Sequence, residues 1–146
     1  KTLPSLFFQG RFQYLKKGKI KNKLFRNEII MIDGAHATAD AKNLAAYLKS
    51  IKIPKYGVWA MSKKKQPDLF IKQLKGVFKK IVTMPIENES NSVSANERYK
   101  VAVKNKFVSE KSKNFEEALK KISSEEKKLI VCFGSLYNCG NILNKN

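Results

Sequence analysis

An aspartate and a histidine lie three residues apart at the point where a hydrophobic run of the sequence ends. Asp33 and His36 begin and end the turn DGAH, which follows the apolar residues 29–32 and precedes a helix-like pattern. A strand that leads into a helix through a short polar turn forms a ligand site at its carboxyl end, where N–H groups and the helix dipole favour anions. A carboxylate and an imidazole at this place could serve a nucleotide or an acidic substrate.

Strand-like and helix-like patterns alternate along the whole chain, and they must position this turn. Strands are expected at residues 11–15, 28–32, 56–61, 80–84, 107–108 and 128–133. Helices are expected at about 39–51, 67–78, 95–104, 115–122 and after Ser135, with a basic turn at 16–23. Such alternation predicts an α/β fold: a doubly wound, mostly parallel sheet with helices on both faces, of the Rossmann-like type.

Ligands of such sheets bind outside the carboxyl ends of the strands. The residues that leave the expected core strands are 33–36, 62–65, 83–87 and 134–135. We therefore expect these four segments to line one edge of the sheet.

Length and composition limit the class of protein. A chain of 146 residues that is 42% hydrophobic fits a single domain with its own core. No apolar run approaches the roughly 18–20 residues of a membrane span, so a cytoplasmic location is expected. Cys132 and Cys139 have no second pair or nearby histidine, which favours two idle thiols over a zinc or redox site. The first residue is Lys1, which suggests a segment of a longer protein.

A net charge of +18 raises the alternative of a basic α/β module that binds nucleic acid. Nearly all of the positive charge is lysine, because arginine occurs only at Arg11, Arg26 and Arg98. Lysine is the poorer residue for bidentate recognition of bases or phosphates. A solvated lysine surface that steers anionic ligands is the other interpretation, and the sequence favours it.

Several complete catalytic motifs are absent from the sequence. It contains no GxxxxGK[ST] phosphate loop, no GxGxxG fingerprint, no usable Ser/His/Asp set and no carboxylate cluster for magnesium. With a single histidine, acid–base chemistry has few candidates. These absences predict a domain that contributes only part of a site.

Four segments together resemble a known family. They are GRFQ at 10–13, IMIDGAH at 30–36, VWAMSKKK at 58–65 and VCFGSLYNCGNIL at 131–143. In this order they are similar to the C-terminal domain of the folylpolyglutamate synthase/dihydrofolate synthase family, which are Mur-type ATP-dependent ligases. The resemblance implies that residues 1–10 are a linker from an N-terminal ATPase domain outside this sequence. It also implies that residues 11–146 are a Mur-ligase-type C-terminal domain.

The resemblance further implies an activity in folate biosynthesis and one-carbon metabolism. A folate or pteroate carboxylate would be converted with ATP and Mg²⁺ to an acyl phosphate, which the amine of L-glutamate then attacks. The magnesium ligands and the phosphate loop are expected in the N-terminal domain, so this domain alone should be nearly inactive. Dihydrofolate synthase and folylpolyglutamate synthase activities both stay open, and a Mur-type ligase for cell-wall precursors shares the architecture.

Site residues follow from the same resemblance. Arg11 would contact the ATP phosphates, Asp33 the ribose, His36 the incoming glutamate or the transferring phosphate as the catalytic residue, and Ser135 the glutamate. Each position has a structural alternative, namely an exposed strand-edge arginine, a helix-capping aspartate, a locally bonded histidine and a helix-capping serine. No metal ligand is expected in this domain.

The sequence departs from the family pattern at two places. Ala37-Thr38 stand where the family has asparagine and proline, and Ser62 is followed by the lysine cluster Lys63–Lys65 without an aspartate. The lysine cluster could meet phosphates or polyglutamate, or it could belong to the general excess of lysine.

Overall fold

The computed structural model describes residues 11–62, 66–89 and 94–146. Its strands are β1 (Gln13–Tyr14), β2 (Glu28–Asp33), β3 (Lys55–Trp59), β4 (Lys80–Thr83), β5 (Ser109–Lys111) and β6 (Lys128–Phe133). Its helices are α2 (Lys19–Lys23), α3 (Thr38–Lys49), α4 (Pro67–Lys72), α5 (Ala95–Lys104), α6 (Phe115–Ile122) and α7 (Leu136–Lys145). The expected linker at residues 1–10 and the Lys63–Lys65 cluster lie outside the described residues.

The strands form one six-stranded sheet in the order β1-β2-β6-β3-β4-β5. All neighbours pair in parallel except β1, which runs antiparallel to β2. Asp33 pairs with Phe133, and Phe133 pairs with Trp59 on its other side. The carboxyl ends of β2, β6 and β3 therefore coincide. The predicted doubly wound, mostly parallel α/β fold is confirmed.

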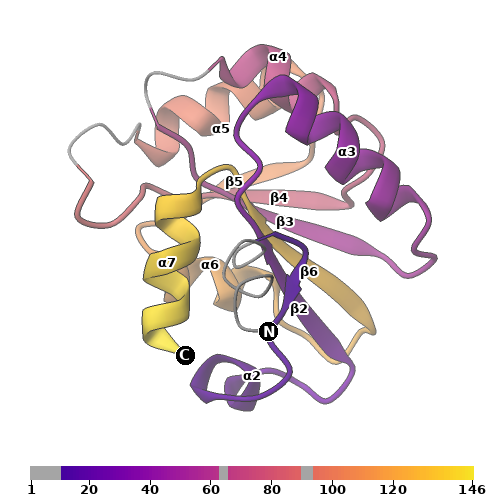
Figure 1. Ribbon diagram of the computed structural model, residues 1–146, viewed down its shortest axis with the longest axis vertical. Helices are drawn as coiled ribbons and strands as arrows, with labels where there is room; N and C mark the ends of the chain where they lie inside the picture. Colours follow the sequence, from indigo (N-terminus) through magenta and orange to yellow (C-terminus); the bar gives the residue numbers. More distant parts are fainter. Residues whose placement is uncertain (1–10, 63–65, 90–93) are drawn as a thin grey trace, which may run out of the picture.

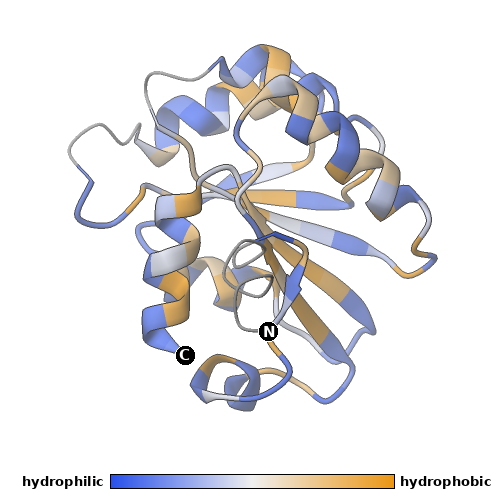
Figure 2. Cartoon of the chain, in the orientation of Figure 1, coloured by the Kyte–Doolittle hydropathy of each residue, from blue (hydrophilic) through white to orange (hydrophobic). Residues whose placement is uncertain are grey.

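Helices cover both faces of the sheet, with α3, α4 and α5 on one face and α2, α6 and α7 on the other (Figure 1). Alternate residues of β6 enter different cores because side chains along a strand point to opposite faces. Ile130 and Cys132 join the core under α6 and α7, whereas Val131 and Phe133 join the core under α3 and α4. Figure 2 shows the resulting contrast between hydrophobic central strands and hydrophilic outer helix surfaces.

Three elements differ from the sequence-based expectation. The strand expected at 107–108 is wrong, because pairing with β4 begins at Ser109, opposite Ile81, and gives β5. Residues 19–23 form the short helix α2 instead of part of a turn, because Ile20 is buried in the core and its N–H donates to Asn146 Oδ1 at 3.0 Å. Helix α4 ends at Lys72 instead of continuing to 78. The following residues form tight turns with i−3 bonds, and Gly76 adopts a φ of 80° that ends helical geometry.

A buried ion pair joins β2 to β6 at the amino ends of the strands. Lys128 Nζ lies 2.9 Å from Glu28 Oε2, and both side chains are fully buried. Glu28 also accepts hydrogen bonds from the Ser123 hydroxyl and from the N–H groups of Ser124 and Phe25. Lys128 also donates to the carbonyl of Ile122. Because both charges have several partners, the pair is well satisfied.

Candidate functional site

The turns that leave β2 and β6 contact each other at the carboxyl edge of the sheet. A Cβ atom placed on Gly34 would lie 2.2 Å from Leu136 Cδ2 and 3.2 Å from Leu136 Cα. Only glycine allows this close approach, which explains the glycine of the DGAH turn. The start of α7 therefore lies directly against the turn that carries His36.

The exit of β3 joins the same edge through Gly134. Gly134 has a φ of 109°, and a Cβ atom there would lie 2.1 Å from the carbonyl oxygen of Ala60. The exit of β4 reaches α7 as well, because Asn141 Nδ2 donates to Glu87 O at 2.9 Å and Tyr137 Oη donates to Asn88 O at 3.2 Å. The described parts of the four predicted exit segments thus meet at one edge.

Asp33 is enclosed at this edge. Its side chain is fully buried, and its two oxygens accept hydrogen bonds from Phe12 N at 2.9 Å and Ala35 N at 2.7 Å. Burial raises the pKa of Asp33, and the two N–H groups and the nearby Arg11 charge only partly oppose this. The predicted ribose contact would therefore require Arg11 or the Phe12 backbone to move.

Arg11 lies over this enclosed acid, with 30% of its side chain exposed. Its Nε is 3.5 Å from Asp33 Oδ1, which is close enough for an ion pair but lacks the geometry of a hydrogen bond. A position just before an edge strand would by itself leave the Arg11 side chain flexible. Phe12 restrains it, because Phe12 adopts a left-handed φ of 47° while its N–H is bound to Asp33 and its ring lies 4.6 Å from Tyr47.

Asp40 is a member of this edge that the sequence analysis missed. Its Oδ2 accepts hydrogen bonds from the N–H groups of Ala37 at 3.2 Å and His36 at 3.4 Å, and its Oδ1 lies 3.7 Å from Arg11 Nη2. Asp40 thus connects Arg11 to the turn that carries His36. A sequence signal exists, because an acid at the third helical position commonly caps the first turn.

His36 is the half-buried, open part of the turn. Its Nδ1 lies 2.9 Å from the carbonyl oxygen of Gly34. A carbonyl can only accept, so Nδ1 carries a hydrogen. In the neutral ring the lone pair is consequently on Nε2, which could accept a proton or a hydrogen bond from a ligand.

Ser135 is the N-cap of α7. Its hydroxyl oxygen accepts a hydrogen bond from Asn138 N at 3.1 Å, and the residue is 8% exposed. This is the geometry of the structural alternative, although a capping serine keeps its O–H available for donation. The following Leu136 and Tyr137 are about half exposed, so the start of α7 presents an apolar surface next to the site.

Other features lie away from this edge or are occupied by the chain's own groups. Within the described ranges, no group of three or more His, Cys, Asp and Glu residues could hold a metal ion. A cavity of about 740 Å³ lies between α2, α6 and the end of α7, near the amino ends of β2 and β6. Cys132 and Cys139 are buried free thiols. No helix in the described part of the chain is long and apolar enough to cross a membrane.

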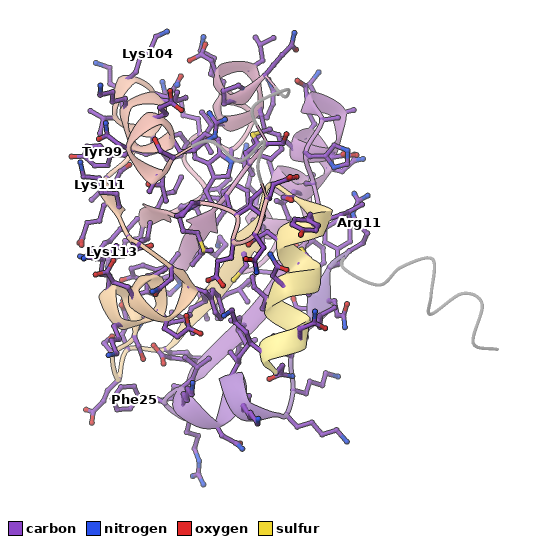
Figure 3. All side chains as sticks on the ribbon, turned by 90° about the vertical axis from the view of Figure 1, so that its left-hand side faces the viewer. Arg11, Phe25, Tyr99, Lys104, Lys111 and Lys113 are labelled. Atoms are coloured by element: carbon purple, nitrogen blue, oxygen red, sulfur yellow. The ribbon has the colours of Figure 1, made fainter. Side chains whose placement is uncertain are left out.

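Lys104, Lys111 and Lys113 lie on a side of the molecule away from Arg11. Figure 3 shows Tyr99, Lys104, Lys111 and Lys113 along one border, with Arg11 near the opposite border. The ammonium of Lys111 lies 5.3 Å from the Tyr99 ring centre and donates to Asn96 Oδ1, and Lys104 lies 3.7 Å from Asp68. These cations are therefore partly engaged within the chain.

The fold and this edge define a doubly wound, mostly parallel α/β domain with charged and polar side chains gathered at the carboxyl ends of its strands. The chain belongs to the family described as dihydrofolate synthetase, C-terminal domain, whose model matches residues 16–145. No curated protein sequence matches it.

Solved structures share the fold at low sequence identity. Escherichia coli FolC in complex with DHPP and ADP is 16% identical, with 93% of this chain and 30% of that chain covered and a TM-score of 0.75. Mycobacterium tuberculosis folylpolyglutamate synthase complexed with ADP and AMPPCP is 18% identical, with 92% and 31% covered and a TM-score of 0.76. A bifunctional folylpolyglutamate synthase/dihydrofolate synthase with Mn, AMPPNP and L-glutamate bound is 17% identical, with 92% and 30% covered and a TM-score of 0.73.

Proposed function

We propose that this chain is the C-terminal domain of an ATP-dependent ligase that joins L-glutamate to a folate or pteroate carboxylate through an acyl phosphate. The family match supports this, and the similar structures carry ADP or ATP analogues, DHPP or L-glutamate. The chain spans about 30% of the length of those structures. A separate N-terminal domain would supply the phosphate loop and the Mg²⁺ ligands, and residues 1–10 would link it to this domain.

The observation that carries the proposal is the restrained position of Arg11. A partly exposed guanidinium is held at the carboxyl edge of the sheet by two carboxylates, Asp33 and Asp40, at 3.5 and 3.7 Å. A fixed, planar and permanently charged group suits the phosphates of ATP, because it needs little reorganisation when charge develops during phosphoryl transfer. Asp33 would act mainly by holding Arg11, and its ribose contact would follow a shift of that side chain.

His36 and Ser135 would serve the glutamate. The Nε2 atom of neutral His36 would accept a proton from the ammonium group of glutamate, which makes the amine nucleophilic. The Ser135 hydroxyl and the N-terminus of α7 would donate hydrogen bonds to a glutamate carboxylate. Closure of the two domains would exclude water from the acyl phosphate and so limit its hydrolysis. The parent ligase would work in the cytoplasm.

The test is an assay of ADP formation by the ligase made of this chain and its N-terminal domain, with dihydropteroate or folate as acceptor. ADP should form only when the acceptor and L-glutamate are both present, and the preferred acceptor separates the two synthase activities. Arg11→Ala should lower kcat/KM for ATP by about 10²–10³-fold. Arg26→Ala removes an exposed arginine and should have no effect. Turnover of Arg11→Ala within twofold of the native value would refute the assignment.

A further inference from the structure

A buried arginine outside the site described above has no ion-pair partner among the described residues. Arg98 of α5 is 3% exposed. Its Nη2 makes a long hydrogen bond of 3.5 Å to the carbonyl of Ser62, and its Nε has no hydrogen-bond partner among the described residues. A buried charge is ordinarily paired, so this arrangement needs an explanation.

No acidic side chain of the chain can supply the missing charge. All twelve aspartates and glutamates lie within the described ranges, and none forms an ion pair with Arg98 there. The undescribed segments contain no acid in their sequence. Glu97, the neighbour of Arg98 on α5, acts only through its more distant charge. Among the described residues, a close counter-charge to Arg98 is thus left for a bound ligand to supply.

A second unpaired donor lies beside Arg98. The guanidinium carbon is 5.6 Å from the ring centre of Trp59, the last residue of β3. Trp59 is fully buried, and within the described structure its Nε1 also has no hydrogen-bond partner. The indole face offsets part of the arginine charge, but an indole N–H can only donate. The stacked guanidinium and indole thus each carry one buried N–H group that lacks an acceptor among the described residues.

We propose that Arg98 and Trp59 form a binding site for a small oxyanion, a carboxylate or a phosphate group. An oxyanion supplies the charge that Arg98 needs and has enough oxygen atoms to accept from both N–H groups. Ser62 follows the end of β3, and Gly134 contacts Ala60 at that same end, so the anion would bind at the edge of the sheet that carries His36. Burial lowers the pKa of Arg98 to about 10, and the charge of Glu97 only partly opposes this.

The single tryptophan of the chain gives a direct test. Trp59 emission is recorded while sodium phosphate or sodium L-glutamate is added to the 146-residue chain at constant ionic strength, with sodium chloride as the reference salt. We expect a saturable change with at least one of the two anions, in the native chain and in the control Arg26→Met. A response to phosphate alone assigns a phosphoryl ligand, and a response to glutamate alone assigns a carboxylate. In Arg98→Met the response should be lost.

Thermal unfolding gives an independent readout. Without an oxyanion, Arg98→Met should melt at a higher temperature than the native chain, because it removes an unpaired buried charge at similar volume. Saturating anion should raise the melting temperature of the native chain only. No saturable emission change in the native chain, the same change in Arg98→Met, or a lower melting temperature of Arg98→Met would each overturn the proposal. These measurements need no turnover, so they stand or fall separately from the ligase assignment.

Discussion

Asp33 binds the backbone of Phe12 through one oxygen and lies 3.5 Å from the Arg11 side chain through the other. One buried carboxylate thus holds both the backbone and the charge of the GR segment. Because Asp40 holds the same guanidinium and the His36 turn, Arg11 and His36 are linked through two acids. The arrangement is a rigid frame that exposes one guanidinium and one imidazole.

Asp33→Asn tests this frame. The amide keeps only one acceptor oxygen, so either Phe12 N or Ala35 N loses its partner, and we expect a loss of about 1–3 kcal/mol in the free energy of unfolding. Glu125→Gln is the control, because Glu125 is exposed and its side chain has no ion pair or hydrogen bond among the described residues. Urea unfolding of both variants gives the comparison. Equal effects of the two changes would contradict a structural role for Asp33.

His36→Gln should separate catalysis from stability. The side chain makes one local contact, to Gly34 O, so the melting temperature should change little. Loss of the proton acceptor should lower glutamate-dependent ADP formation by the complete ligase by about 10²-fold or more. Lys42→Gln, on the exposed face of α3, is the matched control. Native turnover in His36→Gln would remove the catalytic role.

Lys128→Met should lower the free energy of unfolding strongly, although methionine is well suited to a buried position. The change leaves Glu28 charged and buried without its cation, which should cost about 3–5 kcal/mol in the free energy of unfolding. In the double variant Glu28→Gln/Lys128→Met the unpaired charge is gone, so most of this loss should be recovered. Urea denaturation of the single and double variants measures the coupling. Additive losses would show that the pair contributes nothing as a pair.

Glu28 should also shape the response to acid. Burial tends to raise its pKa, but hydrogen bonds from Ser123, Ser124 and Lys128 outweigh this and lower the pKa from its ordinary 4.5. A lowered pKa in the folded state means that this stability is complete above about pH 4.5 and is lost as the pH falls further. Below that pH, the free energy of unfolding should fall less steeply in Glu28→Gln than in the native chain, by up to about 1.4 kcal/mol per pH unit. The same pH dependence of unfolding in Glu28→Gln and in the native chain would contradict this role of Glu28.

Gly134 at the site edge and Gly140 inside α7 differ in the space that an added Cβ atom would have. Gly134→Ala combines a left-handed φ with a clash at Ala60 O, and we expect a loss of about 3 kcal/mol or more. Gly140, inside α7, has open space around it, so Gly140→Ala should increase stability by about 0.5–1 kcal/mol. Melting curves of the two variants test this difference. Similar changes in melting temperature would show that Gly134 is not specifically required at its position.

Much of the fold is accessible from local sequence patterns. Alternating apolar runs predict the parallel strands, and Asn114 is recognisable as the cap of α6, where its side chain accepts from Glu117 N. Helix α2 is different, because Ile20 is held by Asn146, which is 126 residues away. No local pattern contains that contact.

In the site as well, some features can be predicted from local sequence and others depend on contacts between distant segments. The polar turn DGAH at the end of a strand follows from the sequence, whereas the enclosure of Asp33 depends on β1 pairing antiparallel to β2 and bringing Arg11 and Phe12 over it. The importance of Arg98 depends on the absence of a nearby acid in three dimensions. The scarcity of arginine was the only hint that the sequence offered.

The central place of β6 has a consequence for biosynthesis. This strand is the last of the six in chain order, yet it lies between β2 and β3 and pairs with both of them. Until β6 has left the ribosome, β2 and β3 each expose an open edge and hydrophobic residues to solvent, which invites aggregation. Nascent chains of this domain should therefore depend on chaperones until β6 has been synthesised, and chains that end before β6 should be degraded.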